Sequence, residues 1–232
     1  MAELQLNDEY GLVDIPLPEQ PPSQKSSNEF RPFVMRSNVL SKTSGSGYVE
    51  FGNTCVLCTV EGPFDKSREA EEDFEYIGPV NIMTDDVSEE YLLALDKIVE
   101  TFVKTELLVN VEVQVHLKVI SDDGGVLDAS AIAIGLALAS VNIQMNDMPV
   151  AATVLFESRQ STSSILDPTL SQRKDAIKNG GGFVTIVASP VFQQVKYLAS
   201  EGVMTMKQVC FAAEEAFKYA LTLRAYVPSA VK

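Results

Sequence analysis

The clearest pattern of hydrophobic and polar positions lies between Val109 and Val119, where apolar residues alternate with polar ones. The apolar set is Val109, Val111, Val113, Val115, Leu117 and Val119, and the polar set is Asn110, Glu112, Gln114, His116 and Lys118. This alternation predicts a strand that is buried on one face. It places the only histidine of the chain on the polar face. An exposed or partner-contacting role is favoured for His116 over a catalytic one, because no nucleophile is evident beside it.

Three other segments have the pattern of helices. The first begins at Ser88-Glu89-Glu90 and carries its apolar residues on one face: Leu92, Leu95, Val99, Phe102 and Val103. The second, residues 129–139, is built from small and apolar residues and predicts a helix packed tightly on a sheet. The third begins near Thr205, where Gln208 three residues on completes the signature of a capping box. Its stripe of Met206 and Phe217 is assigned to the core rather than to a cofactor site.

Strand signals surround these helices. Residues 47–51 and 54–60 flank a Gly52-Asn53 turn and predict a hairpin that ends at Gly62-Pro63. Further strands are predicted at 150–157, 182–188 and 193–197. The strand that ends before Asp123-Gly124-Gly125 and the helix after it form half of a β-α unit. The order of elements predicts an α+β or α/β fold with mixed sheets and packed helices.

The composition divides the chain into an N-terminal extension and one domain. Residues 1–30 hold four prolines and six acidic residues against one base, Lys25, and are expected to form a flexible extension. Residues 31–232 are expected to form a single domain. The charge run from Asp65 to Asp73 is expected to be a solvated loop.

The charge and the cysteine content exclude several classes of function. The 32 acidic residues against 18 basic ones give a formal net charge of −14, which disfavours a broad surface that binds nucleic acid through phosphates. The longest apolar run is too short to span a membrane and no signal segment is evident, so an intracellular protein with no membrane partner is expected. Cys55 and Cys58 lie three apart in a predicted strand, on opposite faces, and are expected to be core thiols rather than metal ligands. No cofactor or metal site is predicted.

Three segments together resemble the RNase PH family, over about residues 31–226. They are the stretch from Gly45 to Cys58 with Gly62-Pro63, then Asp123-Gly124-Gly125 with its Ala-rich helix, and the run from Ile165 to Thr169. The Leu-Asp-Pro-Thr run and the later Ser189-Pro190 segment are most similar to the ring subunits of the eukaryotic RNA exosome. The order and spacing of the segments carry the resemblance, since each is short.

The resemblance implies an RNase PH-like fold of the ribosomal protein S5 domain 2-like type. It implies a structural subunit of the exosome ring, which supports 3′-to-5′ RNA processing and degradation by an associated nuclease. The implied partners are other RNase PH-like subunits, cap proteins with S1 and KH domains, a hydrolytic exonuclease reached through the complex, and RNA in the central channel. The implied compartments are the nucleus, the nucleolus and the cytoplasm.

The resemblance also implies that catalysis is lost. Active members bind the attacking phosphate with a Thr and an Arg that follow Asp-Gly-Gly at the N-terminus of a helix, where free N–H groups favour anions. The corresponding positions are Val126 and Leu127, followed by Asp128 and preceded by Asp122 and Asp123.

Two further departures point the same way. Active members carry acidic residues some six positions after the position of Asp167, where this chain has Gln172 and Arg173, with Asp175 as the nearest carboxylate. The helix over 88–105 supplies arginines in active members and offers here only Lys97 and Lys104 among Glu89, Glu90, Asp96 and Glu100. No catalytic residue is therefore predicted.

Two alternatives to a structural subunit remain. One is an active phosphate-dependent 3′-to-5′ exoribonuclease, alone or by completing a partner's site, and the other is an acidic adaptor that acts apart from the ring. Direct RNA contact is expected to be minor. Its candidates are Lys66 and Arg68 in the loop after the hairpin, against the alternative that this charged loop is only solvated.

Overall fold

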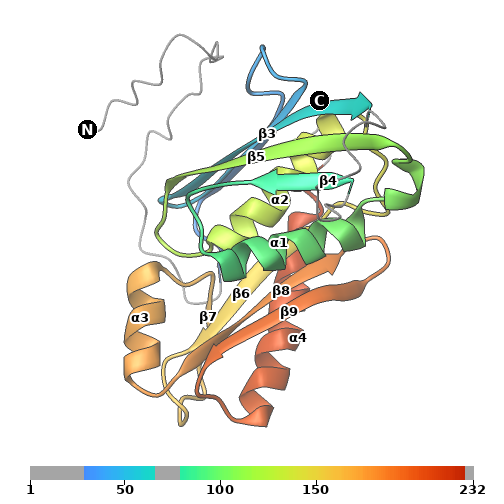
Figure 1. The fold of residues 1–232 in the computed structure, drawn as a ribbon. Coiled ribbons are helices and arrows are strands. Elements are labelled where there is room, and N and C mark those ends of the chain that lie inside the picture. Colours follow the sequence, from blue (N-terminus) through green and yellow to red (C-terminus); the bar gives the residue numbers. More distant parts are fainter. Residues whose placement is uncertain (1–28, 66–78, 228–232) are drawn as a thin grey trace.

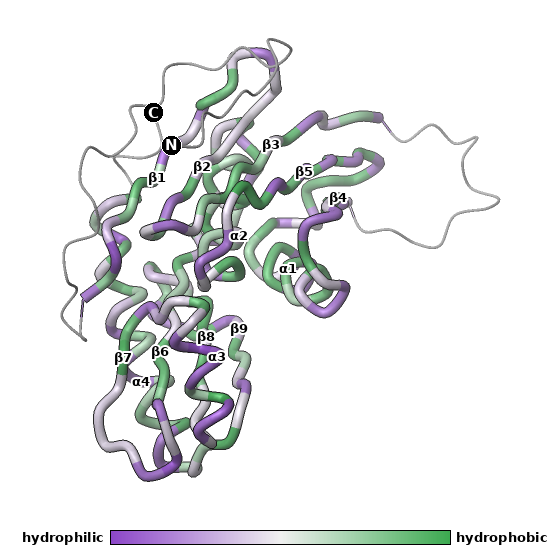
Figure 2. The backbone as a smooth tube through the Cα atoms, turned by 90° about the vertical axis from the view of Figure 1, so that its left-hand side faces the viewer, coloured by the Kyte–Doolittle hydropathy of each residue, from purple (hydrophilic) through white to green (hydrophobic). Residues whose placement is uncertain are grey.

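The computed structural model describes residues 29–65 and 79–227, which form two sheets with helices packed between and around them. The five-stranded sheet has the order β1-β2-β3-β5-β4, and the four-stranded sheet has the order β7-β6-β8-β9. Figure 1 shows the two sheets stacked, with α4 behind the second sheet and α3 at its side. In the view of Figure 2, the five-stranded sheet lies above the four-stranded one. This is the α+β arrangement that the sequence predicts.

The first sheet is built around a long hairpin. Strand β2 (Gly45–Phe51) pairs antiparallel with β3 (Thr54–Asp65) across the Gly52-Asn53 turn, as predicted. Strand β3 continues past Gly62-Pro63, where the end of the strand was predicted, because its pairing with β5 resumes at Phe64 after a register shift between Glu61 and Phe64. The edges are β1 (Phe33–Ser37), paired with β2, and β4 (Val80–Met83), parallel to β5.

Strand β5 (Val111–Ser121) confirms the alternation seen in the sequence. Val113, Val115 and Leu117 are buried, and His116 on the other face is half-buried. Val109 lies before the strand and is 69% exposed, so the prediction of an inward Val109 is wrong. Cys55 and Cys58 lie on opposite faces of β3, the first half-buried and the second fully buried.

The helices α1 (Glu89–Phe102), α2 (Val126–Ser140) and α4 (Met206–Leu223) are those expected from the sequence. Helix α4 has the predicted capping box of Thr205 and Gln208. Helix α2 is buried along almost its whole length and contacts both sheets, so it forms the centre of the core. At Gly47 the backbone of β2 approaches α2 so closely that a Cβ would meet the amide nitrogen of Ala137 at 2.9 Å.

The second sheet consists of β6 (Val150–Phe156), β7 (Ile165–Leu166), β8 (Gly182–Ser189) and β9 (Gln194–Gly202). A helix that the sequence reading missed, α3 (Leu170–Lys178), follows β7. The short 3-10 turn η2 (Thr105–Leu107) follows α1. Of the predicted N-terminal extension, residues 1–28 lie outside the described part of the chain, whereas Phe30 packs on Phe33, Phe51 and Tyr219.

Candidate functional site

The Asp122–Gly125 turn joins β5 to α2 and is fixed by contacts with three other segments. Gly124 and Gly125 have φ values of 88° and 85°, a conformation that glycine adopts at no steric cost. A Cβ on Gly124 would meet the amide nitrogen of Leu170 at 2.7 Å. The carbonyl of Gly124 accepts a hydrogen bond from Thr54 Oγ1 at 2.6 Å, and the carbonyl of Asp123 accepts one from Leu170 N at 2.9 Å. The turn is therefore packed against the start of α3.

Arg31 links this turn to Asp167. Its Nε donates to Asp167 Oδ2 at 2.9 Å and its Nη2 to Oδ1 at 2.7 Å, a two-pronged ion pair. The remaining donors reach the carbonyls of Asp123 at 2.9 Å and Gly124 at 2.8 Å. Arg31 and Asp167 are 6% and 4% exposed. Both oxygens of Asp167 thus accept hydrogen bonds from Arg31 in a buried ion pair that holds the turn in place.

The first residues of α2 do not share one direction. Val126 lines a cavity of about 330 Å³, whereas Leu127 lines a second cavity of about 250 Å³ and Asp128 lines neither. Consecutive residues of a helix point about 100° apart, so the three side chains cannot all occupy the place of one anion. Of the three positions after Gly125, only Val126 therefore lines the first cavity. Asp122, in contrast, does line the first cavity.

Asp128 is turned into the core, where it is 4% exposed. Its Oδ2 accepts a hydrogen bond from Thr153 Oγ1 at 2.6 Å and lies 3.8 Å from Nη2 of Arg173. Its Oδ1 has no hydrogen-bond partner among the residues that the structure describes. Burial raises the pKa of Asp128 to about 6, although the charge of Arg173 and the hydrogen bond from Thr153 act in the opposite direction.

Helix α3 supplies the other wall of the first cavity. Thr169 and Gln172 form a capping box at its start, so the side chain of Gln172 is engaged with the backbone of Thr169. Asp175 points to solvent, 68% exposed, and lies 3.8 Å from Lys178. The position six residues after Asp167 is occupied by Arg173, whose guanidinium lies 4.7 Å above the ring of Phe183.

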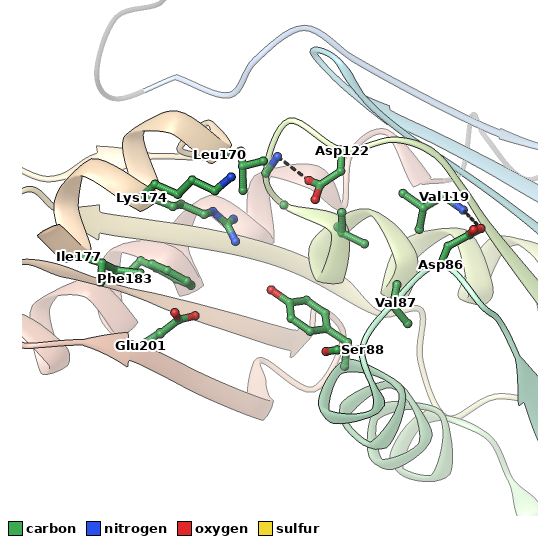
Figure 3. A pocket seen from close by; sticks show the side chains of 15 residues that line it. Asp86, Val87, Ser88, Val119, Asp122, Leu170, Lys174, Ile177, Phe183 and Glu201 are labelled. Atoms are coloured by element: carbon green, nitrogen blue, oxygen red, sulfur yellow. Dashed lines mark hydrogen bonds between the residues drawn. The ribbon is translucent and has the colours of Figure 1, made fainter.

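The lining of the first cavity comes from six elements, α1, β5, α2, α3, β8 and β9, and from the segments between them (Figure 3). Lys174 reaches from α3 toward the wall that holds Asp122, and Glu201 lies on the opposite side. Asp122 accepts a hydrogen bond from Gly124 N at 2.8 Å, and Asp86 accepts one from Val119 N at 2.9 Å. Helix α1 contributes Tyr91 to the lining, whereas Lys97 and Lys104 do not reach it.

The remaining predicted residues lie elsewhere. Of the acidic residues of α1, Glu90 lines the second cavity and none lines the first. Lys66 and Arg68, the candidates for RNA contact, lie outside the described residues. No cluster of three or more His, Cys, Asp or Glu side chains that could hold a metal ion occurs in the described ranges. None of the described helices is long and apolar enough to cross a membrane.

The sequence reading did not identify Arg31 as a partner of Asp167 or Arg173 as a partner of Asp128. The two partners of each pair are separated by many residues along the chain, so no local spacing indicates the contact.

Three comparisons place the chain among known proteins. The chain is 26% identical over 213 residues to exosome complex component MTR3 of Homo sapiens, covering 79% of this chain and 75% of that protein. It is 29% identical over 195 residues to the RRP41 homolog of Arabidopsis thaliana, covering 78% of each. The crystal structure of rice (Oryza sativa) Rrp46 matches 90% of this chain and 99% of that one, with a TM-score of 0.76 and 20% identity, and so shares the fold.

The family comparison covers the first sheet and the part of the site formed by Arg31, the Asp-Gly-Gly turn and the start of α2. The RNase PH family, described as the 3′ exoribonuclease family, domain 1, matches residues 29–144, which include Arg31, the Asp-Gly-Gly turn and all of α2. The archaeal exosome core shares the fold at a TM-score of 0.66. The hairpin, the glycine turn and the buried helix that follows it are therefore those of this family, and the chain belongs to the 3′ exoribonuclease (RNase PH) family.

Proposed function

We propose that this chain is a non-catalytic structural subunit of an RNA exosome ring, where it supports 3′-to-5′ RNA processing and degradation by an associated nuclease. The observation that carries the proposal is the state of the candidate site. The carboxylate of Asp167 is held on both oxygens by Arg31. The position six residues later is an arginine, and the first residue of α2 presents carbon to the cavity.

Phosphorolysis needs a bound phosphate and a group that transfers a proton, held in mutual reach. A guanidinium in place of a carboxylate cannot act as a base, because arginine stays protonated in proteins. Of the three carboxylates that line the cavity, Asp86 is paired with Lys118 at 2.9 Å, Asp122 accepts a hydrogen bond from the Gly124 amide, and Glu201 lies on β9. Because Asp86 and Asp122 already have partners within the chain, a structural role is favoured over that of an active exonuclease.

The relatives and the surface favour an assembly. Relatives of this chain are described as exosome complex components. Strand β9 pairs only with β8 within the described sheets, and Val195 and Leu198 on it are 44% and 46% exposed. An exposed strand edge with apolar residues is suited to cover by a neighbouring chain. The proposed partners are further RNase PH-like subunits, cap proteins with S1 and KH domains and, through the complex, a hydrolytic exonuclease, in the nucleus, nucleolus and cytoplasm.

The proposal is tested by two measurements on the full-length chain. Mass spectrometry of a complex purified through this chain should identify five further RNase PH-like chains and three cap proteins, and recovery of a stable monomer from cell extract would instead favour the adaptor. Phosphate-dependent digestion of RNA should release no nucleoside diphosphate from the isolated chain. In the assembled ring, any release should be unchanged by Asp122→Asn. Release that this substitution abolishes would show that the chain is an enzyme.

A further inference from the structure

The second cavity, of about 250 Å³, is formed by α1, the start of α2 and one face of the β8–β9 pair. On this face Phe183 is paired with Glu201, and Thr185 with Ala199. Residues two apart in a strand share a face of the sheet, so these four side chains lie on the same side. Helix α1 lies over this side (Figure 1). The cavity is therefore enclosed by regular elements rather than by loops.

The charged groups of this cavity are all acidic. Glu90 and Glu201 line it and are exposed, so their carboxylates lie near its mouth. Within the described part of the chain, neither carboxylate has a hydrogen bond or an ion pair. The described residues of the lining include no lysine, arginine or histidine. The mouth of the cavity therefore attracts a positively charged group.

The hydroxyl of Thr185 adds an acceptor inside the cavity, where this residue is 3% exposed. Thr153 Oγ1 donates its only proton to Asp128 Oδ2 at 2.6 Å. Thr185 Oγ1 lies 2.7 Å from Thr153 Oγ1, so Thr185 must donate its own proton to that bond. A ligand in the cavity can therefore donate to Thr185 Oγ1 but cannot accept from it.

The rest of the lining is largely apolar and aromatic. Ala94, Leu127 and Phe183 are each 7% exposed and form the floor, and the rings of Tyr91 and Tyr197 line it as well. Aromatic rings attract cations through their faces. A cavity of about 150 Å³ already holds one benzene ring. This larger cavity has room for a ring with a short side arm.

Two basic residues lie near this cavity without lining it. Arg173 and Lys174 line the first cavity and not the second. The guanidinium of Arg173 lies over the ring of Phe183 at 4.7 Å. Lys174 lies across the first cavity from Glu201 (Figure 3), and no ion pair joins the two in the described ranges. The carboxylate of Glu201 is therefore open to a cation that enters the second cavity.

The arrangement of charge and apolar surface favours a free amine over a protein side chain. The carboxylates lie at the mouth and the apolar residues at the floor, so a ligand fits when its apolar end enters first. A lysine or arginine side chain would enter with its charge first and would bring it against Leu127 and Phe183. A phosphate or a nucleotide is disfavoured, because both carboxylates repel it.

We propose that the second cavity binds a small organic amine, which consists of a primary ammonium group on an apolar body. The ammonium group lies at Glu90 and Glu201, and the apolar body packs on Leu127 and Phe183. This ligand is opposite in charge to the phosphate and the RNA that the family resemblance implies. The proposal does not depend on the proposed role in a ring.

The class of ligand is tested by isothermal titration calorimetry of the full-length chain with phenethylamine at constant ionic strength and neutral pH. Phenethyl alcohol has a similar body without the charge and should bind about tenfold more weakly, the loss expected for one charged hydrogen bond. Hydrocinnamate, an anion, should not bind. Acetylargininamide represents a protein side chain and should bind more weakly than phenethylamine. The proposal is overturned if phenethylamine does not bind, or if any of the other three compounds binds as tightly.

The place of binding is tested with three variants. Glu201→Gln should weaken binding of phenethylamine about fivefold, the effect expected for an exposed ion pair. Glu89→Gln is the matched control, because Glu89 is exposed on α1 beside Glu90, lies outside the lining and should change the affinity less than about twofold.

Ala199→Leu fills the cavity and keeps both carboxylates, so it should weaken binding more than about tenfold. Ala199 is half-buried on the edge strand β9, and thermal unfolding should show that the variant is folded. If Glu201→Gln and Glu89→Gln bind phenethylamine equally well, or if folded Ala199→Leu binds it like the wild type, the amine does not occupy this cavity and the proposal is wrong.

Discussion

At the scale of single residues, buried charges in this molecule occur as neighbours of opposite sign. Arg31 pairs with Asp167 at 2.7 Å, and Arg173 approaches Asp128 at 3.8 Å. The two pairs differ in their hydrogen bonding. Arg31 donates to both carboxylate oxygens of Asp167, whereas Arg173 and Asp128 share no hydrogen bond. A well-bonded buried pair is costly to break, because the remaining charge has no solvent. The first pair is therefore structural, whereas the second leaves Nε and Nη2 of Arg173 enclosed and without a hydrogen bond among the described residues.

Replacing Arg31 should show how strongly the first pair holds the turn. Arg31→Ala leaves the carboxylate of Asp167 buried without its partner, and the free energy of unfolding should fall by about 3–5 kcal/mol. Urea denaturation of the full-length chain measures it. Lys178→Ala, which breaks an exposed pair with Asp175, should change the value by less than about 0.5 kcal/mol. If the double variant Arg31→Ala/Asp167→Ala loses as much as the sum of the single variants, the pairing argument is wrong.

Asp128 should give the stability a pH dependence of its own. Its pKa is raised from 3.8 to about 6 by burial, so the folded chain holds a proton between these values that the unfolded chain releases. The contribution of Asp128 to the free energy of unfolding is fully present below about pH 4 and is lost as the pH rises through about 6. The loss amounts to about 3 kcal/mol. Arg173, Thr153, Asp167 and Arg31 are the groups that act on it.

The variant Asp128→Asn removes this titration. The free energy of unfolding of the wild type relative to Asp128→Asn should therefore decrease between pH 4 and pH 7, as followed by urea denaturation at each pH. The exposed Asp175→Asn, measured in the same way, should give a nearly flat difference. If the free energy of unfolding of the wild type relative to Asp128→Asn does not change with pH, or increases with pH, the pKa of Asp128 is not raised.

At the scale of elements, local patterns predicted most of the fold and none of its long-range contacts. Alternation found β5, and the Thr205/Gln208 capping box found the start of α4. The same signature at Thr169 and Gln172 marks the start of α3. The pattern of apolar residues does not predict this helix, because α3 is short and rich in lysine and arginine. Strand β3 passes the Gly62-Pro63 signal because pairing with β5 resumes beyond it, and this depends on tertiary context.

The contact of β2 with α2 offers a test at this scale. Gly47→Ala places a Cβ against the backbone of Ala133 and 2.9 Å from Ala137 N, so the helix would have to move as a unit. We expect a loss of more than about 3 kcal/mol in the free energy of unfolding, at the upper end for overpacking. Gly180→Ala is the comparison, because its Cβ meets nothing within 4 Å and only its φ of 73° is unfavourable, at about 1 kcal/mol. An equal loss in the free energy of unfolding in both variants would show that the close approach of β2 to α2 does not require glycine at position 47.

At the scale of the whole molecule, net charge opposes RNA binding by the chain alone. With 32 acidic against 18 basic residues, the chain has no long-range attraction to a phosphate backbone. Fluorescence anisotropy with a labelled single-stranded RNA should therefore give a Kd of about 10⁻⁴ M or weaker at physiological salt, at the weak end of non-specific binding. Lys66→Ala/Arg68→Ala should leave this unchanged in the isolated chain. If the chain binds RNA with micromolar affinity and this double variant abolishes the binding, the segment after β3 contacts RNA and the chain is itself an RNA-binding protein.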